Sequence, residues 1–157
     1  MRWNKLTLLL SLLVPVIIVF DSCKPEDQVS PPTTYSKTDI VMSGAQETPV
    51  NPSPGTGRLN VSYSKVSKLL SYSFTWSGLT GPPNAAHIHG LAPAGYPASV
   101  VQTFSSLAAS TSGSYSGSFL VDGIKVKEED LLSGLYYVNI HTNTYPGGEI
   151  RGQIRFY

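Results

Sequence analysis

Residues 57–77 read GRLNVSYSKVSKLLSYSFTWS, and this stretch decides which kind of fold the chain adopts. In both of its halves, large apolar side chains alternate with small or polar ones. The alternating apolar residues are Leu59, Val61, Tyr63, Tyr72, Phe74 and Trp76. A period of two places such residues on one face of a β-strand. The stretch therefore predicts two strands whose apolar faces belong to the core.

The same kind of pattern extends in both directions from this stretch. Short runs rich in Val, Ile, Tyr, Phe and Thr are separated by clusters of Gly, Pro, Asn and Ser, and helical periodicity is nearly absent. One short helix is expected at residues 127–132, where acidic residues near its start suit the helix dipole. The expected strands are residues 39–43, 57–64, 69–77, 85–89, 100–104, 114–121, 135–142 and 149–156. About eight short strands predict a sandwich or a barrel.

The N-terminal segment has the features of an export signal. Arg2 and Lys5 precede an apolar segment of 15 residues, 6–20, and Ser22 stands directly before the only cysteine, Cys23. A membrane-spanning helix needs about 20 residues. A permanent transmembrane helix is therefore the weaker interpretation.

Cys23 is the expected site of lipidation. An exported protein with a single thiol cannot form an internal disulfide, and residues 19–23, VFDSC, resemble the lipobox of bacterial lipoproteins. The resemblance implies that residues 1–22 are a lipoprotein signal peptide. Residues 23–37, rich in Pro, Ser and Thr, are expected to form a flexible tether to a domain at residues 38–157. A signal anchor or an ordinary signal peptide is the alternative.

These features also predict a location. Residues 24–27, KPED, resemble an acidic surface-export signal of bacterial lipoproteins. We therefore expect an exported protein, lipid-anchored at the bacterial outer membrane or cell surface. The membrane is then one partner, reached through the N-terminal lipid.

Charge and motif content exclude several classes of protein. Loss of residues 1–22 removes Arg2, Lys5 and Asp21, so the 11 basic and 10 acidic residues of the full sequence become 9 of each. A neutral chain without a basic block is not expected to bind nucleic acid. The sequence also contains no Gly-x-Ser-x-Gly, no His-Glu-x-x-His and no phosphate-binding glycine loop. We therefore expect a protein that is not an enzyme.

Three separated segments of the domain resemble the CHRD domain, which is named after chordin. They are MSGAQETPV at residues 42–50, AHIHG at 86–90, and YVNIHT at 137–142 running on to YPGGEIRGQ at 145–153. The resemblance implies an all-β fold, an immunoglobulin-like or Greek-key antiparallel β-sandwich of about eight strands with one short helix. It brings no catalytic residue with it. It implies a non-enzymatic binding or structural module, with an extracellular protein or a glycan as partner.

All three histidines of the chain lie in these segments. A spacing of two on a strand points His87 and His89 to one face. If strands 85–89 and 135–142 are neighbours, His141 joins them and forms a three-imidazole cluster of the kind that binds zinc or copper. Glu149 or Asn139 could supply an oxygen ligand. This predicts, as the alternative function, a metal-binding or redox-related domain.

The histidines also have a structural interpretation. Their ring nitrogens would then bond loop carbonyls or Glu149 and hold the glycine-rich end of the domain closed, because buried polar groups must find partners. No cofactor is required in that case. The sequence leaves both interpretations open.

Further polar residues lie in the matching segments. Gln46 and Glu47 are expected to form a loop that hydrogen-bonds to the histidine-bearing strand. The residues that alternate with the apolar ones on the last strand are expected to form a solvated outer face. They are Glu149, Arg151, Gln153 and Arg155. Arg151 is the expected exception, where a guanidinium paired with Glu47 or Glu149 would brace the end of the sheet.

Overall fold

The structure is a computed structural model that describes residues 32–157. The predicted signal peptide, the lipidation site Cys23 and the first part of the predicted tether lie outside the described residues. Within residues 32–157, no helix is long and apolar enough to cross a membrane.

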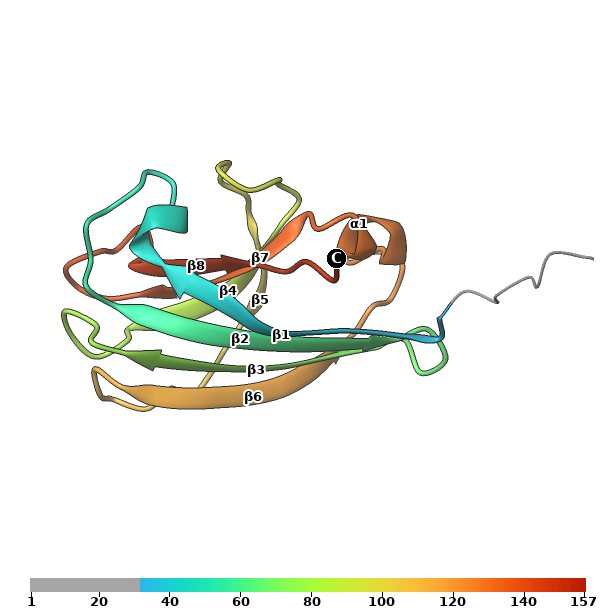
Figure 1. The fold of residues 1–157 in the computed structure, drawn as a ribbon, viewed down its shortest axis with the longest axis horizontal. Helices are drawn as coiled ribbons and strands as arrows, with labels where there is room; N and C mark the ends of the chain where they lie inside the picture. The colour runs from blue at the N-terminus through green and yellow to red at the C-terminus, as the bar shows by residue number, and fades with distance from the viewer. Residues whose placement is uncertain (1–31) are drawn as a thin grey trace, which may run out of the picture. The chain divides into compact units, whose positions relative to one another are not determined.

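The described residues form an all-β domain with two short helical segments (Figure 1). The helical segments are the 3₁₀ helix η1 (Gly44–Gln46) and the helix α1 (Glu128–Leu132). The strands are β1 (Thr34–Ser43), β2 (Thr56–Ser64), β3 (Leu69–Ser77), β4 (Ala85–Gly90), β5 (Val100–Thr103), β6 (Gly113–Leu120), β7 (Tyr136–His141) and β8 (Ile150–Gln153). The strands and the single short α-helix agree closely with those predicted from the sequence.

One continuous sheet joins all the described strands in the order β5-β4-β7-β8-β1-β2-β3-β6, and neighbouring strands are antiparallel. The sheet curls, so that β2, β3 and β6 run along one side of the domain and β7 and β8 along the other (Figure 1). The all-β, antiparallel prediction is confirmed. The immunoglobulin-like or Greek-key sandwich is not, because a sandwich has two separate sheets. Here a single register pair, Ser43 with Arg151, keeps β1 and β8 in one sheet.

The core lies inside the curl, and it contains the alternating residues that the sequence singled out. Residues of β2 and β3 face residues of β4, β7 and β8 across it. Its buried residues include Leu59, Val61, Tyr63, Leu70, Tyr72, Phe74, Trp76, Ala86, Ile88, Val138, Ile140, Ile150 and Ile154. Burial of this apolar surface is the main force that holds the curl closed.

The ends of two strands differ from the prediction. β1 begins at Thr34, which pairs with Ser64, so the last residues of the predicted tether are part of the sheet. β8 ends at Gln153, although Ile154 and Phe156 beyond it remain buried. Apolar alternation alone cannot mark these ends, because strand pairing depends on whether a partner strand extends as far.

Candidate metal-binding site

Strands β4 and β7 bring the three histidines together. In their antiparallel pairing His87 lies opposite Asn139, and His89 lies opposite Tyr137, two residues along. Directly paired residues project from the same face of a sheet, so His141, which follows two residues after Asn139, joins that face. One ring nitrogen of each histidine lies within 4.8 Å of the others. The predicted three-imidazole cluster is present.

Asn139 stands at the centre of this cluster. Its Oδ1 is 3.0 Å from Nε2 of His89 and 2.9 Å from Nε2 of His141. Nδ1 of His87 is 3.0 Å from the same Nε2 of His141. Three ring nitrogens and one amide oxygen are thus joined by successive close contacts. Of the two oxygen ligands suggested by the sequence, Asn139 is in place.

Backbone carbonyls fix the tautomers of two rings. Nδ1 of His89 is 2.9 Å from the carbonyl oxygen of Ala98, and Nδ1 of His141 is 2.9 Å from that of Pro146. A carbonyl can only accept, so both Nδ1 atoms carry the proton. In a neutral ring Nε2 then bears a lone pair. Both lone pairs are directed at the centre of the cluster.

Burial favours the neutral form of His87 and His141. His89 is buried, and His87 and His141 are half-buried. Desolvation, together with the neighbouring His141 and His89, lowers the pKa of His87 to about 4. Desolvation also lowers the pKa of His141. Neutral imidazole is the form that binds a metal.

Glu47 lies on the other side of Asn139. It is buried, and while its Oε2 accepts a hydrogen bond from the backbone N–H of Thr48, its Oε1 has no partner among the described residues. Desolvation raises its pKa to about 7, against the opposing effects of Thr48, Arg151 and Asn139. Gly148, at φ +131°, leaves this space free, because a Cβ there would lie 2.9 Å from Nδ2 of Asn139 and would collide with the Glu47 carboxylate. The amide therefore presents Nδ2 to Glu47 and Oδ1 to the histidines.

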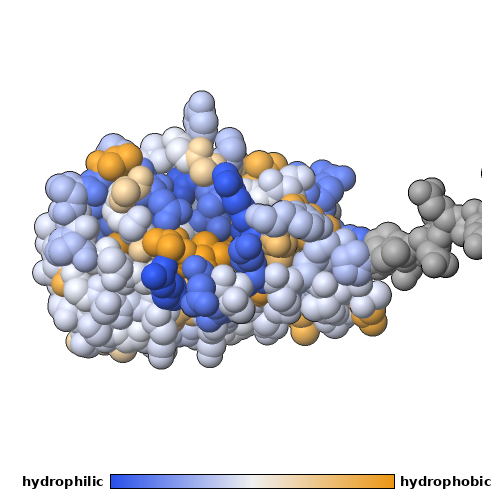
Figure 2. Space-filling view, viewed as in Figure 1, coloured by the Kyte–Doolittle hydropathy of each residue, from blue (hydrophilic) through white to orange (hydrophobic). Residues whose placement is uncertain are grey.

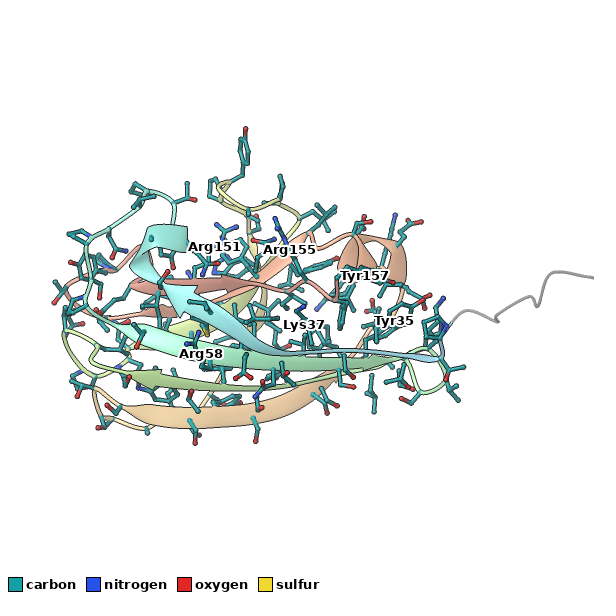
Figure 3. The ribbon with its side chains drawn as sticks, viewed as in Figure 1. Tyr35, Lys37, Arg58, Arg151, Arg155 and Tyr157 are labelled. Atoms are coloured by element: carbon teal, nitrogen blue, oxygen red, sulfur yellow. The ribbon has the colours of Figure 1, made fainter. Side chains whose placement is uncertain are left out.

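Arg151 is the largest fully buried side chain, 1 % exposed (Figure 3). It donates to the carbonyls of Tyr96 at 3.0 Å and Pro93 at 3.4 Å, and to Oε1 of Gln153 at 2.8 Å. Its guanidinium also lies 3.4 Å from the ring centroid of Tyr137. Arg151 thus braces the end of the sheet, but through carbonyls and a cation–π contact, and it forms no ion pair with Glu47 or Glu149.

The prediction of a solvated outer face on the last strand is wrong for Glu149 and Gln153, and Arg151 is the exception that the sequence predicts. Glu149, Arg151 and Gln153 are buried, and only Arg155 is exposed. The loop after β4 covers this face, and the side chain of Gln153 donates to the carbonyl of Ala92 within it. Alternation along a strand cannot show that a distant loop covers its polar side.

Glu149 and Gln46 lie outside the histidine cluster. The carboxylate of Glu149 accepts hydrogen bonds from Ser53 at 2.7 Å, from Thr80 and from Thr142. Burial works to raise its pKa, but these bonds outweigh burial and lower it. Gln46 donates to the carbonyl of Val41 and not to the histidine-bearing strand. Neither side chain is placed to complete a metal site.

Sequence reasoning missed Tyr137. Its ring stacks on His89, with centroids 4.8 Å apart and an interplanar angle of 6°, and its hydroxyl accepts from the N–H of Ala98. The same Ala98 supplies the carbonyl that fixes His89. Tyr137 stands two residues before Asn139 on its strand, so the alternation that placed Asn139 and His141 on one face also applies to it.

Fold and site together define an all-β domain with an imidazole cluster on one face of two neighbouring strands. The chain belongs to the CHRD domain family, whose model matches residues 38–154. Among curated proteins and among solved structures, nothing matches the chain.

Proposed function

We propose that this CHRD domain is a metal-binding module of the cell envelope, in which His87, His89 and His141 hold a zinc or copper ion. The proposal rests on one observation. The Nδ1 protons of His89 and His141 are engaged by backbone carbonyls, which turns both Nε2 lone pairs toward Oδ1 of Asn139.

Electrostatics favours a cation at this point. With neutral rings, the contacts of 2.9 and 3.0 Å between Nε2 and Oδ1 contain no proton. Atoms that present only lone pairs repel each other at that distance, and a bound cation turns the repulsion into attraction. His87 has no backbone partner in the described structure, and its Nδ1 contacts only Nε2 of His141 among the hydrogen bonds of the described residues, so loss of the proton in that contact would make Nδ1 the third nitrogen ligand.

The role that we propose is binding rather than catalysis. The carbonyls of Ala98 and Pro146 orient the two rings as outer partners do in known metal sites. The half-buried rings of His87 and His141 leave a route from solvent. Export and lipid attachment at Cys23 are supported by the N-terminal sequence and would present this module outside the cytoplasm.

Metal analysis of the purified full chain tests this function. The protein, dialysed against zinc or copper and then against metal-free buffer, is expected to retain about one ion per chain, as a three-histidine site would. His87→Ala and His141→Ala should lose it. Glu129→Gln, which changes an exposed carboxylate on α1, is the matched control and should retain it.

A wild-type chain without stoichiometric metal contradicts the proposal, and so do histidine variants that bind metal as the wild type does. A purely structural role of the histidines predicts the first of these results, together with reduced stability of the histidine variants.

A hollow between β1 and the C-terminal residues favours a second binding function. Figure 2 shows apolar side chains at the bottom of a depression with hydrophilic residues around it. Its lining includes Ile40, Val41, Ala94, Lys37, Arg155 and Tyr157. Such a mixture of apolar, cationic and tyrosine side chains suits an extracellular protein or a glycan. Retention of cell-surface glycans by the wild type but not by Lys37→Glu would support this function, and equal retention would contradict it.

A further inference from the structure

Strand β6 lies at one end of the sheet, and one of its two sides has no partner strand. It pairs only with β3, and Figure 1 shows no strand beyond it. Val121, directly after β6, donates its N–H to the carbonyl of Lys68, next to β3. Because backbone groups alternate in direction along an antiparallel strand, odd-numbered positions of β6 face β3 and even-numbered positions face away. The outward N–H and C=O groups have no hydrogen-bond partner among the described residues. The outward positions are Ser114, Ser116, Ser118 and Leu120.

The edge formed by β6 lacks the features that protect open edges. Natural proteins protect such edges with short strands, charged residues, proline or bulges. β6 has eight residues, no charged residue and no proline, and its register with β3 is unbroken. The other end of the sheet, β5, is protected, because it has four residues and a bulge interrupts its pairing with β4. Of the two edges of the described sheet, β6 is therefore the one suited to accept a further strand.

The backbone of β6 can pair with a second copy of itself in the antiparallel direction. When two copies are related by a two-fold axis through Gly117, every outward position lies opposite an outward position of the other copy. All the free N–H and C=O groups of both edges then pair. An axis through Ser116 would instead place Leu120 opposite Ser112, which lies outside the strand. The axis through Gly117 therefore gives the larger number of hydrogen bonds.

On the outer face of β6, the register about Gly117 places serine opposite serine. Ser116 of one copy lies opposite Ser118 of the other, and the symmetry repeats this pair. Serines in such positions bond within the domain, because Ser36 on β1 is paired with Ser62 on β2 and their hydroxyl oxygens lie 2.9 Å apart. β6 carries no charge, so no like charges meet across the strand pair when two copies approach.

On the inner face of β6, the same register places aromatic rings together. Tyr115 packs against Phe74 and Phe119 packs against Tyr72, with ring centroids 5.5 and 6.3 Å apart. Both rings of β6 are only half-buried, because the sheet ends beside them. In the dimer, Tyr115 lies opposite Phe119 of the second copy, and the symmetry repeats this pair. Aromatic cross-strand pairs stabilise antiparallel sheets, so each copy covers the rings that the other leaves half-exposed.

We propose that this protein forms a symmetric dimer in which the β6 strands of two copies pair about Gly117 and join the two sheets into one. Each copy uses the same edge in such an interface, so the assembly closes at two copies. The histidine cluster lies on β4 and β7, which four other strands separate from β6 in the sheet order. The dimer therefore does not depend on metal binding.

The molar mass of the full chain in solution tests the dimer. Every chain carries Cys23→Ser, which prevents lipid attachment, and a mild detergent covers the apolar segment 6–20. Size exclusion with multi-angle light scattering is expected to give a protein mass twice that of the monomer. Ser116→Pro should be monomeric, because proline removes an outward N–H and leaves the pairing with β3 intact. The proposal is overturned if the otherwise unchanged chain is monomeric at every concentration tested, or if Ser116→Pro remains dimeric.

Thr103→Pro is the matched control at the other edge of the sheet. Phe104 donates its N–H to the carbonyl of Ala86 on β4, so the N–H of the preceding Thr103 points away from β4. Proline at this position likewise removes only an outward donor, and the variant should remain dimeric. Circular dichroism establishes that each variant folds. A folded Thr103→Pro chain that is monomeric would contradict association through β6.

Disulfide cross-linking tests the register. In the Cys23→Ser chain the introduced cysteines are the only thiols. A mixture of chains with Ser116→Cys and chains with Ser118→Cys should cross-link on mild oxidation, because opposite Cα atoms are about 5.5 Å apart, within reach of a disulfide. Chains with Ser116→Cys alone should not cross-link, since their thiols are offset by two residues. Self-linking of these chains, or no link in the mixture, would overturn the pairing about Gly117. Should Ser116→Pro unfold, the cross-links and the mass of the otherwise unchanged chain still decide the outcome.

Discussion

Arg151 lies between the loop that follows β4 and the ring of Tyr137, so its guanidinium serves several neighbours at once. A guanidinium suits this position, because its N–H groups donate to carbonyls on one side while its flat face stacks on an aromatic ring. Through Tyr137 and the loop, the same guanidinium supports the surroundings of His89. At the scale of the single residue, a buried charge organises the end of the domain.

Replacement of Arg151 by Ala is expected to lower the free energy of unfolding by about 3 kcal/mol, since buried carbonyls would lose their donors. Arg151→Lys should lower the free energy of unfolding by less than Arg151→Ala does, but by more than about 1 kcal/mol, because an ammonium cannot reach several carbonyls at once as a planar guanidinium does. Urea unfolding monitored by tyrosine and tryptophan fluorescence measures both. Arg155→Ala, at an exposed position beyond the end of β8, should change stability by less than about 0.5 kcal/mol. If Arg151→Ala lowers the free energy of unfolding no more than Arg155→Ala does, Arg151 does not stabilise the end of the sheet.

At the scale of elements, helix α1 is fastened to the sheet through Glu128. Its carboxylate accepts hydrogen bonds from Tyr63 at 2.7 Å and Lys68 at 2.8 Å, and it pairs with Lys65 at 3.1 Å. Tyr63 and the two lysines belong to β2 and to the turn that leads into β3. A helix of five residues has little stability of its own, so these contacts hold it in place.

The pH dependence of stability should reveal the contribution of the Glu128 carboxylate. The hydrogen bond from Lys68, and then that from Tyr63, lower the pKa of Glu128 to about 2. Because the folded pKa lies below the unfolded one, the stabilisation is complete above about pH 4.5 and declines as the pH falls toward 2. Glu128→Gln should therefore be less stable than the wild type at pH 7, and the difference should narrow between pH 4.5 and 2. Thermal unfolding across this range measures it.

Glu129→Gln provides the comparison for this measurement, because Glu129 is exposed on the same helix. It should follow the wild type over the whole pH range. A constant difference between Glu128→Gln and the wild type would show that the carboxylate does not act through its charge.

At the scale of the whole molecule, the shared core and several hydrogen bonds join the two halves of the curled sheet. One register pair joins β1 to β8, and the side chain of Asn51 donates to the carbonyls of Gly148 and Glu149 across the junction. Glu47 crosses the same junction to reach Asn139. The histidines themselves all lie on β4 and β7. The histidine cluster thus belongs to one half, and residues of both halves surround it.

The predicted lipid anchor also concerns the whole molecule. Cys23→Ser should move the protein from the membrane fraction to the soluble fraction of the cell envelope, because the acyl chains are then absent. Cell fractionation followed by immunoblotting measures the distribution. Retention of the variant in the membrane would favour a signal anchor instead. Asn84→Ser, far from the N-terminus in the sequence, should remain distributed as the wild type is.

The sequence by itself determined the local features of this protein. The period of two fixed which residues face the core, and it placed His87 with His89 and Asn139 with His141, since neighbouring positions on a strand obey geometry that needs no distant partner. Only the tertiary structure decided that β4 and β7 are neighbours, that one curled sheet replaces a two-sheet sandwich, and that a loop covers Arg151 and Gln153. These features depend on contacts between segments far apart in the chain. Local alternation is the same whether a loop covers a strand or water does.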